Sequence, residues 1–509
     1  MEVQPGRASF LALAGGLTLA ASFPPWSTPW LAPVGVAALV TAVGRRPAAG
    51  AWVGASFGLV FVGVASWWLA ESIAIAAWVG VVLVQALWFG LLGTALALVR
   101  RLPGWPLWAG CVWSTVEAAR STWPWGGFPW ARLGFSALDT PWAGSLAVLG
   151  VAGTGLLIAC AGALLAALAT ALLGVRREGS RPSRIVALSA AGLALVATVH
   201  LVGRSVGGAD GGSARQSARV AVVQAEVPGD GTDVVGNHRA ITDVLLDETR
   251  EVAGRWTASG QVPELVVWPE NATAVDPQTD ARARDVLLAA ARTAGAPVLA
   301  GSIVDDGPSS ALNQAIVWSA AGPGARYTKQ HLVPFGEYVP LRALAERLSS
   351  RVAQIERDMT PGGAAAPMRV GGLRVANALC FDVAYDAVIR DQVRQGADFV
   401  VVQTSNAMFL GTAQQEQQWS ITRARAIEVG RSVVVSSMNG ITGAVSYDGS
   451  VLEQLPDTRA GSFVVDLPIA SDLTIATLVG PWLERAAWAG AELALISGLV
   501  RRRQRSVEG

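Results

Sequence analysis

The chain has 509 residues, of which 52% are hydrophobic, and its mean hydropathy is +0.41. This composition is too apolar for an ordinary soluble enzyme, and a formal net charge of +1 gives no reason to expect nucleic acid as a partner. Residues 8–203 are a succession of apolar runs, whereas residues 218–467 have the charge density of a globular domain. We therefore expect two parts of different kind, one of them in a membrane.

Several apolar runs are candidates for membrane spans, since a helical span needs about 20 mostly apolar residues. They lie near residues 8–23, 30–44, 51–69, 76–99, 105–119, 143–173, 185–203 and 480–500. If the spans alternate in direction, the arginine clusters that flank them fall on one side, which is typical of the cytoplasmic side. We predict a polytopic α-helical membrane protein with about eight spans and an extracytoplasmic α/β domain. It would lie in the bacterial cytoplasmic (inner) membrane, with both termini inside.

The composition also suggests boundaries along the chain. They are a transmembrane region of about seven spans at 1–203, a flexible Gly/Ser-rich linker at 204–219, a polar domain at 220–470, and a last span with a cytoplasmic tail at 471–509. Within the polar domain, short β-branched runs alternate with helical stretches such as 281–294 and 412–430. This alternation predicts a layered α/β architecture.

Three of the predicted strands end in a reactive residue. The runs VVWPE, GARYTK and VANALC end at Glu270, Lys329 and Cys380. Strand ends can converge on one edge of a sheet, and a carboxylate, an ammonium and a thiol together suit acyl transfer. Glu270 would take the thiol proton, Lys329 would favour the thiolate and the oxyanion, and Cys380 would attack the carbonyl. Taken one at a time, the three residues also have structural explanations. Glu270 would be a turn residue, Lys329 a solvated charge and Cys380 a small buried hydrophobic residue.

The rest of the polar part offers few alternatives. Lys329 is the only lysine in the chain, and Cys380 is the only cysteine outside the apolar runs, which hold Cys111 and Cys160. The histidines lack the spacing of metal ligands, and no glycine-rich phosphate loop is present. We expect neither a metal nor a cofactor.

The order WPE, KQHLVPFGEYVP and ALCFD resembles the Glu-Lys-Cys signature of the carbon-nitrogen hydrolase (nitrilase) superfamily. The long middle motif, with SFPPW after the first apolar run and WSTVEAARSTWPWGGFPWARLG at 113–134, resembles the apolipoprotein N-acyltransferases over essentially the whole chain. The resemblance implies an αββα sandwich for the polar domain. It also implies that Glu270 is the general base, Lys329 the oxyanion stabiliser and Cys380 the nucleophile.

The same resemblance implies a ping-pong reaction with a phospholipid acyl donor and a diacylated lipoprotein acceptor. It suggests Glu337 as an accessory carboxylate and the backbone NH of Phe381 as a second oxyanion donor, with Asp382 and Asn406 also near the substrate. This chain departs from the pattern, because Phe381 and Asp382 stand where many relatives have Tyr and Glu, and Ala407 where they have Asp.

Other features are open to two interpretations each. Glu117 and Arg120, about one turn apart near the end of an apolar run, either pair or reach the membrane interface. The aromatic residues at 123–130 form either an interfacial belt or the wall of a lipid entrance. Residues 341–368 form either a mobile arm on the membrane or an ordinary surface loop.

Two other functions compete with acyl transfer to a lipoprotein. The first is a membrane-tethered amidase or nitrilase that hydrolyses a small C–N substrate with the same three residues. The second is a transporter or receptor with an external binding domain, but few polar residues lie in the predicted spans.

Overall fold

The computed structural model describes residues 4–175, 216–229, 231–259, 262–340, 357–456 and 458–507, with 190, 192, 194 and 342 as single positions. It divides into two compact units, one of Met1–Gly208 with Thr474–Gly509 and one of Ala209–Leu473. Most of the predicted span 185–203 and of the linker 204–219 lies outside the described residues, as does most of the first half of 341–368.

The first unit is helical. Its helices are α1 (Pro5–Ala20), α2 (Ala32–Ala42), α3 (Pro47–Ala65), α4 (Trp68–Ser72), α5 (Ile75–Val99), α6 (Trp105–Arg120), α7 (Ser145–Val175) and α14 (Ile475–Val507). Among the described residues, three helical segments are long and apolar enough to cross a membrane: Pro47–Ala65, Ile75–Val99 and Ser145–Leu172. The apolar helical character predicted for this region is confirmed, while the number of about eight spans stays a prediction.

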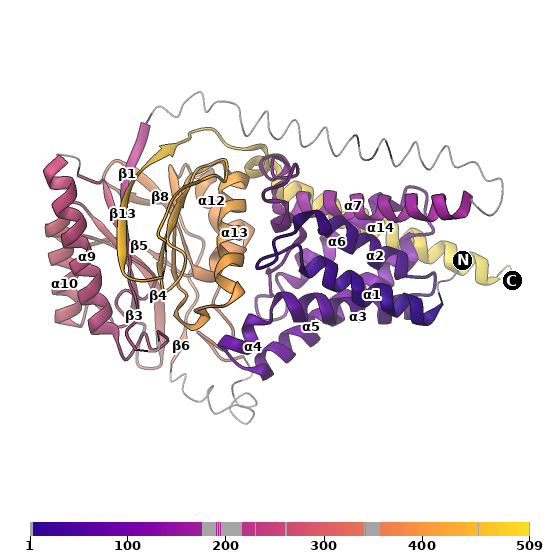
Figure 1. Cartoon of the computed structure of the whole chain (residues 1–509), viewed down its shortest axis with the longest axis horizontal. Helices are drawn as coiled ribbons and strands as arrows, with labels where there is room; N and C mark the ends of the chain where they lie inside the picture. The colour runs from indigo at the N-terminus through magenta and orange to yellow at the C-terminus, as the bar shows by residue number, and fades with distance from the viewer. Residues whose placement is uncertain are drawn as a thin grey trace. The chain divides into compact units, whose positions relative to one another are not determined.

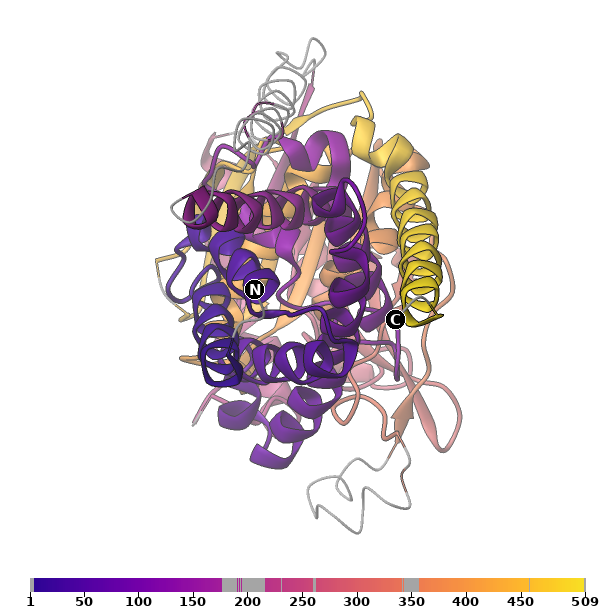
Figure 2. The same ribbon diagram turned by 90° about the vertical axis from the view of Figure 1, so that its right-hand side faces the viewer.

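Glycines allow helices α3 and α5 to pack closely. A Cβ atom at Gly54 would lie 2.0 Å from the carbonyl oxygen of Phe89, and one at Gly93 would lie 2.0 Å from the carbonyl oxygen of Gly50. Small residues at this spacing let two backbones approach where the surrounding solvent is as apolar as the side chains. Helix α14, drawn in yellow in Figure 2, packs against α5, α6 and α7 of the same unit.

Glu117 and Arg120 form a buried charged pair in α6, and Arg120 stabilises the loop that follows the helix. Arg120 lies 3.8 Å from Glu117, and its guanidinium donates to backbone carbonyls of that loop. The accepting oxygens belong to Phe128, Trp130 and Ala131, at 3.0, 3.1 and 3.2 Å. The two residues therefore pair rather than reach the interface, and they hold a loop on which Trp123 and Trp125 are exposed.

The second unit contains two β-sheets. The first sheet has the order β13 (Gly461–Ile469), β1 (Gln216–Gln224), β2 (Leu265–Val267), β3 (Val298–Asp305), β4 (Ser310–Ser319) and β5 (Gly322–Thr328), with β6 (Asp358–Met359) beside β4. The second has the order β12 (Val451–Gln454), β11 (Gly443–Val445), β10 (Val433–Met438), β9 (Phe399–Ser405), β8 (Leu373–Leu379) and β7 (Met368–Val370). Strands β1 to β3 and β8 to β10 run parallel, so each sheet has a parallel centre whose carboxyl ends share one edge.

Helices cover the outer face of each sheet, which gives four layers (Figure 1). Helices α9 (His238–Ser259) and α10 (Ala281–Ala294) pack on the first sheet, and α12 (Asp386–Arg394) and α13 (Ala413–Val429) lie over the second. Asp280 caps α10 by accepting from the backbone NH of Ala283, and Gly295 ends it with φ +63°. The sheets face each other through β1 with β10 and β4 with β8. The predicted α/β sandwich is confirmed.

The close α3–α5 contact can be tested with one methyl group. Gly54→Ala would place a Cβ against the Phe89 carbonyl, so we expect the free energy of unfolding to fall by about 1–3 kcal/mol, as in other overpacked contacts. Gly80→Ala in α5 is the control, because nothing lies within 4 Å of its Cβ. Thermal unfolding in detergent should show a lower midpoint for Gly54→Ala only. Equal midpoints would contradict the close packing.

Candidate active site

The three reactive residues lie where strands end, and all are buried. Glu270 follows β2, Lys329 follows β5 directly, and Cys380 follows β8 and opens a 3-10 turn, η4 (Cys380–Ala384). Their exposed fractions are 3%, 2% and 8%. A Cβ atom at Gly301 in β3 would lie 2.5 Å from the Cα atom of Glu270, so β3 needs a glycine there for the Glu270 backbone to fit.

The ammonium group of Lys329 lies between two carboxylates. Its Nζ atom is 3.1 Å from Oε1 of Glu270 and 2.9 Å from Oε1 of Glu337. The second oxygen of each carboxylate accepts from a backbone NH at 2.9 Å, that of Ser405 for Glu270 and that of Val333 for Glu337. The structure thus brings three of the residues singled out in the sequence into direct contact.

Asn313 in β4 links the same two carboxylates, and it was not among the residues predicted for the site from the sequence. Its Nδ2 atom donates to Oε1 of Glu270 at 2.8 Å and to Oε1 of Glu337 at 2.9 Å. Its backbone carbonyl also accepts from the backbone NH of Lys329 at 2.9 Å. The only signal in the sequence is a pair of adjacent amide residues, Asn313 and Gln314, inside a largely apolar strand.

These contacts fix the protonation state of Lys329. Burial would lower the pKa of the ammonium, but the charges of Glu270 and Glu337 outweigh burial and raise that pKa well above its usual value. Lys329 is therefore a fixed positive charge at any physiological pH. It cannot serve as a base, whereas it can stabilise negative charge that develops nearby.

Cys380 has an uncommon backbone conformation and a neutral thiol. Its φ of +48° lies in the left-handed region, which costs a residue with a side chain about 1–3 kcal/mol and is typical of functional sites. Burial and the negative charge of Glu270 raise the pKa of the thiol to about 12, although Lys329 acts in the opposite direction. The resting sulfur is therefore protonated at neutral pH.

Asp382 connects the Cys380 turn to the end of β5. It is fully buried, and it accepts from the Tyr327 hydroxyl at 2.7 Å and from the backbone NH of His331 at 2.8 Å. Burial raises its pKa to about 6, even though Lys329 and Tyr327 lower it. These contacts hold the turn in place beside the strand end that carries Lys329.

The other residues singled out in the sequence surround this centre. The ring of Phe381 meets that of Tyr385 edge-on, with 5.4 Å between the ring centroids. The ring of Tyr385 stacks on that of His331, with 3.6 Å between the centroids. Asn406 is buried and donates to Gln418, whose own amide donates to the Cys380 sulfur at 3.7 Å. Gln418 is a second residue that the sequence did not indicate, because it lies in a helix with several similar glutamines.

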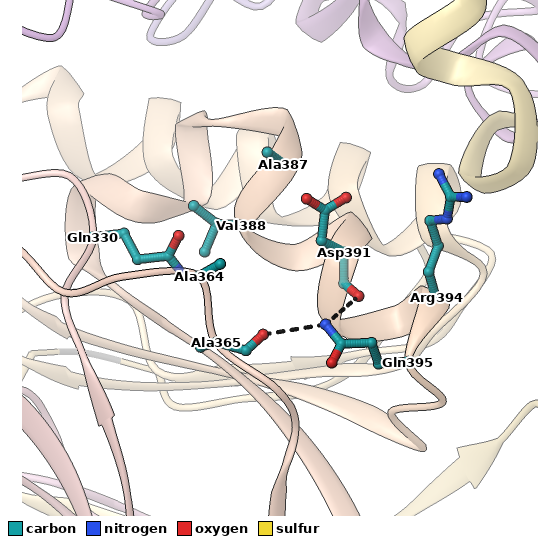
Figure 3. Close-up of a pocket in the computed structure, with 8 residues that line it drawn as sticks. All are labelled: Gln330, Ala364, Ala365, Ala387, Val388, Asp391, Arg394 and Gln395. Atoms are coloured by element: carbon teal, nitrogen blue, oxygen red, sulfur yellow. Dashed lines mark hydrogen bonds between the residues drawn. The ribbon is translucent and has the colours of Figure 1, made fainter.

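A separate hollow of about 340 Å³ lies next to this region (Figure 3). It is lined by Gln330, Ala364, Ala365, Ala387, Val388, Asp391, Arg394 and Gln395. Gln395, at the end of α12, donates to the backbone carbonyl of Ala365 and to that of Asp391 one turn earlier in the same helix. The lining does not include the Glu270–Lys329 pair or Cys380. In the described part of the chain, no three His, Cys, Asp or Glu side chains are grouped so that they could hold a metal ion.

Comparison with known proteins matches both units. Residues 15–164 match the family model of the apolipoprotein N-acyltransferase N-terminal domain, and residues 219–472 match that of the carbon-nitrogen hydrolases. The apolipoprotein N-acyltransferase of Mycolicibacterium smegmatis is 32% identical over 96% of this chain and 84% of its own. That of Methylococcus capsulatus is 28% identical over 88% of each chain.

Among solved structures, an amidase from Nesterenkonia sp. is similar to part of the chain. It is 22% identical, with a TM-score of 0.38, and the match covers 52% of this chain and 96% of the amidase. The sequence relatives cover nearly the whole chain and both of its units. On these matches, the chain belongs to the apolipoprotein N-acyltransferase family.

Proposed function

We propose that this protein transfers a fatty acyl chain from a phospholipid to the amino group of an N-terminal diacylglyceryl-cysteine on lipoproteins. Cys380 would carry the chain as a thioester between the two steps. The observation that carries the proposal is a buried ammonium held between two carboxylates beside a strained cysteine, in a member of this family. Relatives matched over most of the chain bear the acyltransferase name, so the amidase alternative has no better support.

In the first step, the Cys380 sulfur attacks the ester carbonyl of the phospholipid as Glu270 accepts the thiol proton. The carbonyl oxygen becomes an oxyanion, which Lys329 and the backbone NH of Phe381 would stabilise. The ester bond then breaks, and Glu270 returns the proton to the lysophospholipid oxygen. The thiol pKa of about 12 supports this order, because a thiol that stays protonated at rest needs a base at the moment of attack.

In the second step, Glu270 removes a proton from the α-amine of the acceptor, and the amine attacks the thioester carbonyl. The C–S bond breaks, the new amide forms, and the sulfur recovers its proton from Glu270. Glu337 would keep Lys329 in place through both steps. Burial of Glu270, Lys329 and Cys380 supports transfer to an amine over hydrolysis, because water would be kept from the thioester.

The same proposal includes the arrangement in the membrane. Residues 1–203 would provide about seven spans, residues 204–219 a linker and residues 471–509 a last span with a cytoplasmic tail. The catalytic domain at 220–470 would then lie on the outer face of the bacterial inner membrane. The apolar helices and the one-sided distribution of arginines support this arrangement.

The thioester can be detected directly. Purified full-length protein mixed with phosphatidylethanolamine should gain the mass of one acyl chain, and Cys380→Ala should gain none. Adding a peptide that begins with diacylglyceryl-cysteine should remove the adduct and produce the N-acylated peptide. An amidase or a transporter would show no lipid adduct, so a wild-type protein that stays unmodified would refute the proposal.

Glu270→Gln should change the rate of acyl transfer and the rate of Cys380 alkylation in opposite directions. Loss of the base should slow acyl transfer by about 10²–10⁴-fold. The substitution also removes the negative charge that raises the thiol pKa, so that pKa should fall, and alkylation of Cys380 by iodoacetamide at pH 8 should become faster. Slower alkylation together with slower transfer would indicate a damaged site and not a missing base.

The glycine beside Glu270 should also affect catalysis. Gly301→Ala would push against the Glu270 backbone, and we expect the adduct to form at least about tenfold more slowly, because small misplacements of catalytic groups are costly. Gly372→Ala is the control, since nothing lies within 4 Å of its Cβ. Adduct formation is followed by intact mass over time. Wild-type rates for Gly301→Ala would mean that this contact does not position the base.

A further inference from the structure

The Cys380 sulfur has a polar neighbour that the proposed mechanism does not use. Gln418, in α13, is buried to an exposed fraction of 4%, and its Nε2 atom lies 3.7 Å from the sulfur. This contact comes from a helix that carries none of Glu270, Lys329 and Glu337. Hydrogen bonds to sulfur are longer than hydrogen bonds to oxygen. The 3.7 Å between Nε2 and the sulfur is therefore a hydrogen-bond distance.

The orientation of the Gln418 amide is set by its other edge. Its Oε1 atom accepts from Nδ2 of Asn406 at 2.9 Å and lies 3.3 Å from the hydroxyl of Thr404. Asn406 is held in turn, because its Oδ1 accepts from Thr404 at 2.8 Å and its backbone NH donates to Met438 at 2.9 Å. With the carbonyl edge of Gln418 occupied, the NH₂ edge faces the sulfur.

The charges around the sulfur leave a role for such a donor. The charged groups that act on Cys380 are Glu270, Lys329 and Glu337, and the two carboxylates oppose the formation of a thiolate. Lys329 favours a thiolate, but its ammonium is already bound by both carboxylates. A neutral amide adds an N–H donor to the site without adding a charge or an ionisable group.

We propose that Gln418 is a further catalytic residue of the acyl transfer, whose amide N–H donates to the Cys380 sulfur as it becomes negative. Asn406 is a positioning residue that keeps the amide turned toward the sulfur, whereas Thr404 hydrogen-bonds Asn406 and also interacts directly with the Cys380 thiol. The inference rests on the proposed function, and it adds no bond change to it. The thiol proton still goes to Glu270, the acyl carbon still bonds to sulfur, and Gln418 keeps its protons throughout.

The test is the rate at which iodoacetamide alkylates Cys380 between pH 7 and 10, in full-length protein in detergent, read by peptide mass. Gln418→Met removes the donor, and alkylation should be about tenfold slower at each pH, as expected when a hydrogen bond to a charged group is lost. Gln414→Met is the matched control. It replaces another buried glutamine one turn earlier in α13, and it should alkylate at the wild-type rate.

Gln418→Glu covers the case in which the methionine variant misfolds or changes access to the sulfur. The side chain keeps its size but presents an acceptor and a negative charge, so alkylation should slow by more than in Gln418→Met. Wild-type rates in both variants would overturn the role of Gln418, even if the wild-type protein forms the acyl adduct. If both variants are alkylated slowly but the wild-type protein forms no acyl adduct, the hydrogen bond would be supported and the acyl transfer would be rejected.

Discussion

The contact of Lys329 with two carboxylates is the constraint that the rest of the site satisfies. A buried ammonium loses its hydration, and only good geometry with paired and hydrogen-bonded counter-charges offsets that loss. Glu270 and Glu337 provide the charges, and Asn313 holds both carboxylates at the same time. Removal of any one of these groups would leave another buried and unsatisfied. The same arrangement gives Glu270, the proposed base, a fixed position before any substrate binds.

The packing of the two sheets brings this cluster to the cysteine. Asn313 lies in the first sheet and Glu270 and Lys329 follow strands of it, whereas Cys380 follows a strand of the second. Hydrogen bonds join the two sides at the site. One runs from the backbone NH of Ser405 to Glu270, another from the hydroxyl of Tyr327 to Asp382, and a third from Gln403 to the carbonyl of Trp268 at 2.7 Å. The positions of the proposed base and nucleophile therefore depend on the interface between the sheets.

Much of this fold follows from local sequence patterns. The helix predicted at 281–294 coincides with α10, and the strand runs that end near Glu270, Lys329 and Cys380 are β2, β5 and β8. Short edge strands such as β6 and β12 were not predicted, since a few residues carry no clear alternation. Asn313 and Gln418 were missed because their importance depends on partners far along the chain. The left-handed backbone conformation of Cys380 was not predicted either, because the residues around it have the sequence pattern of a continuous strand.

The burial and charge of the site keep the thiol of Cys380, the proposed nucleophile, protonated at rest. One ammonium faces two carboxylates, so the cluster is already negative before the thiol ionises. Burial disfavours a free thiolate, and the negative charge of Glu270 disfavours it further, so the pKa of Cys380 is raised to about 12. A protonated thiol resists oxidation and side reactions, which depend on the thiolate. In the proposed reaction Glu270 would take the proton as the carbonyl is attacked, so the total charge of the cluster would not change. The negative charge would then move to the carbonyl oxygen, where the buried ammonium would stabilise it.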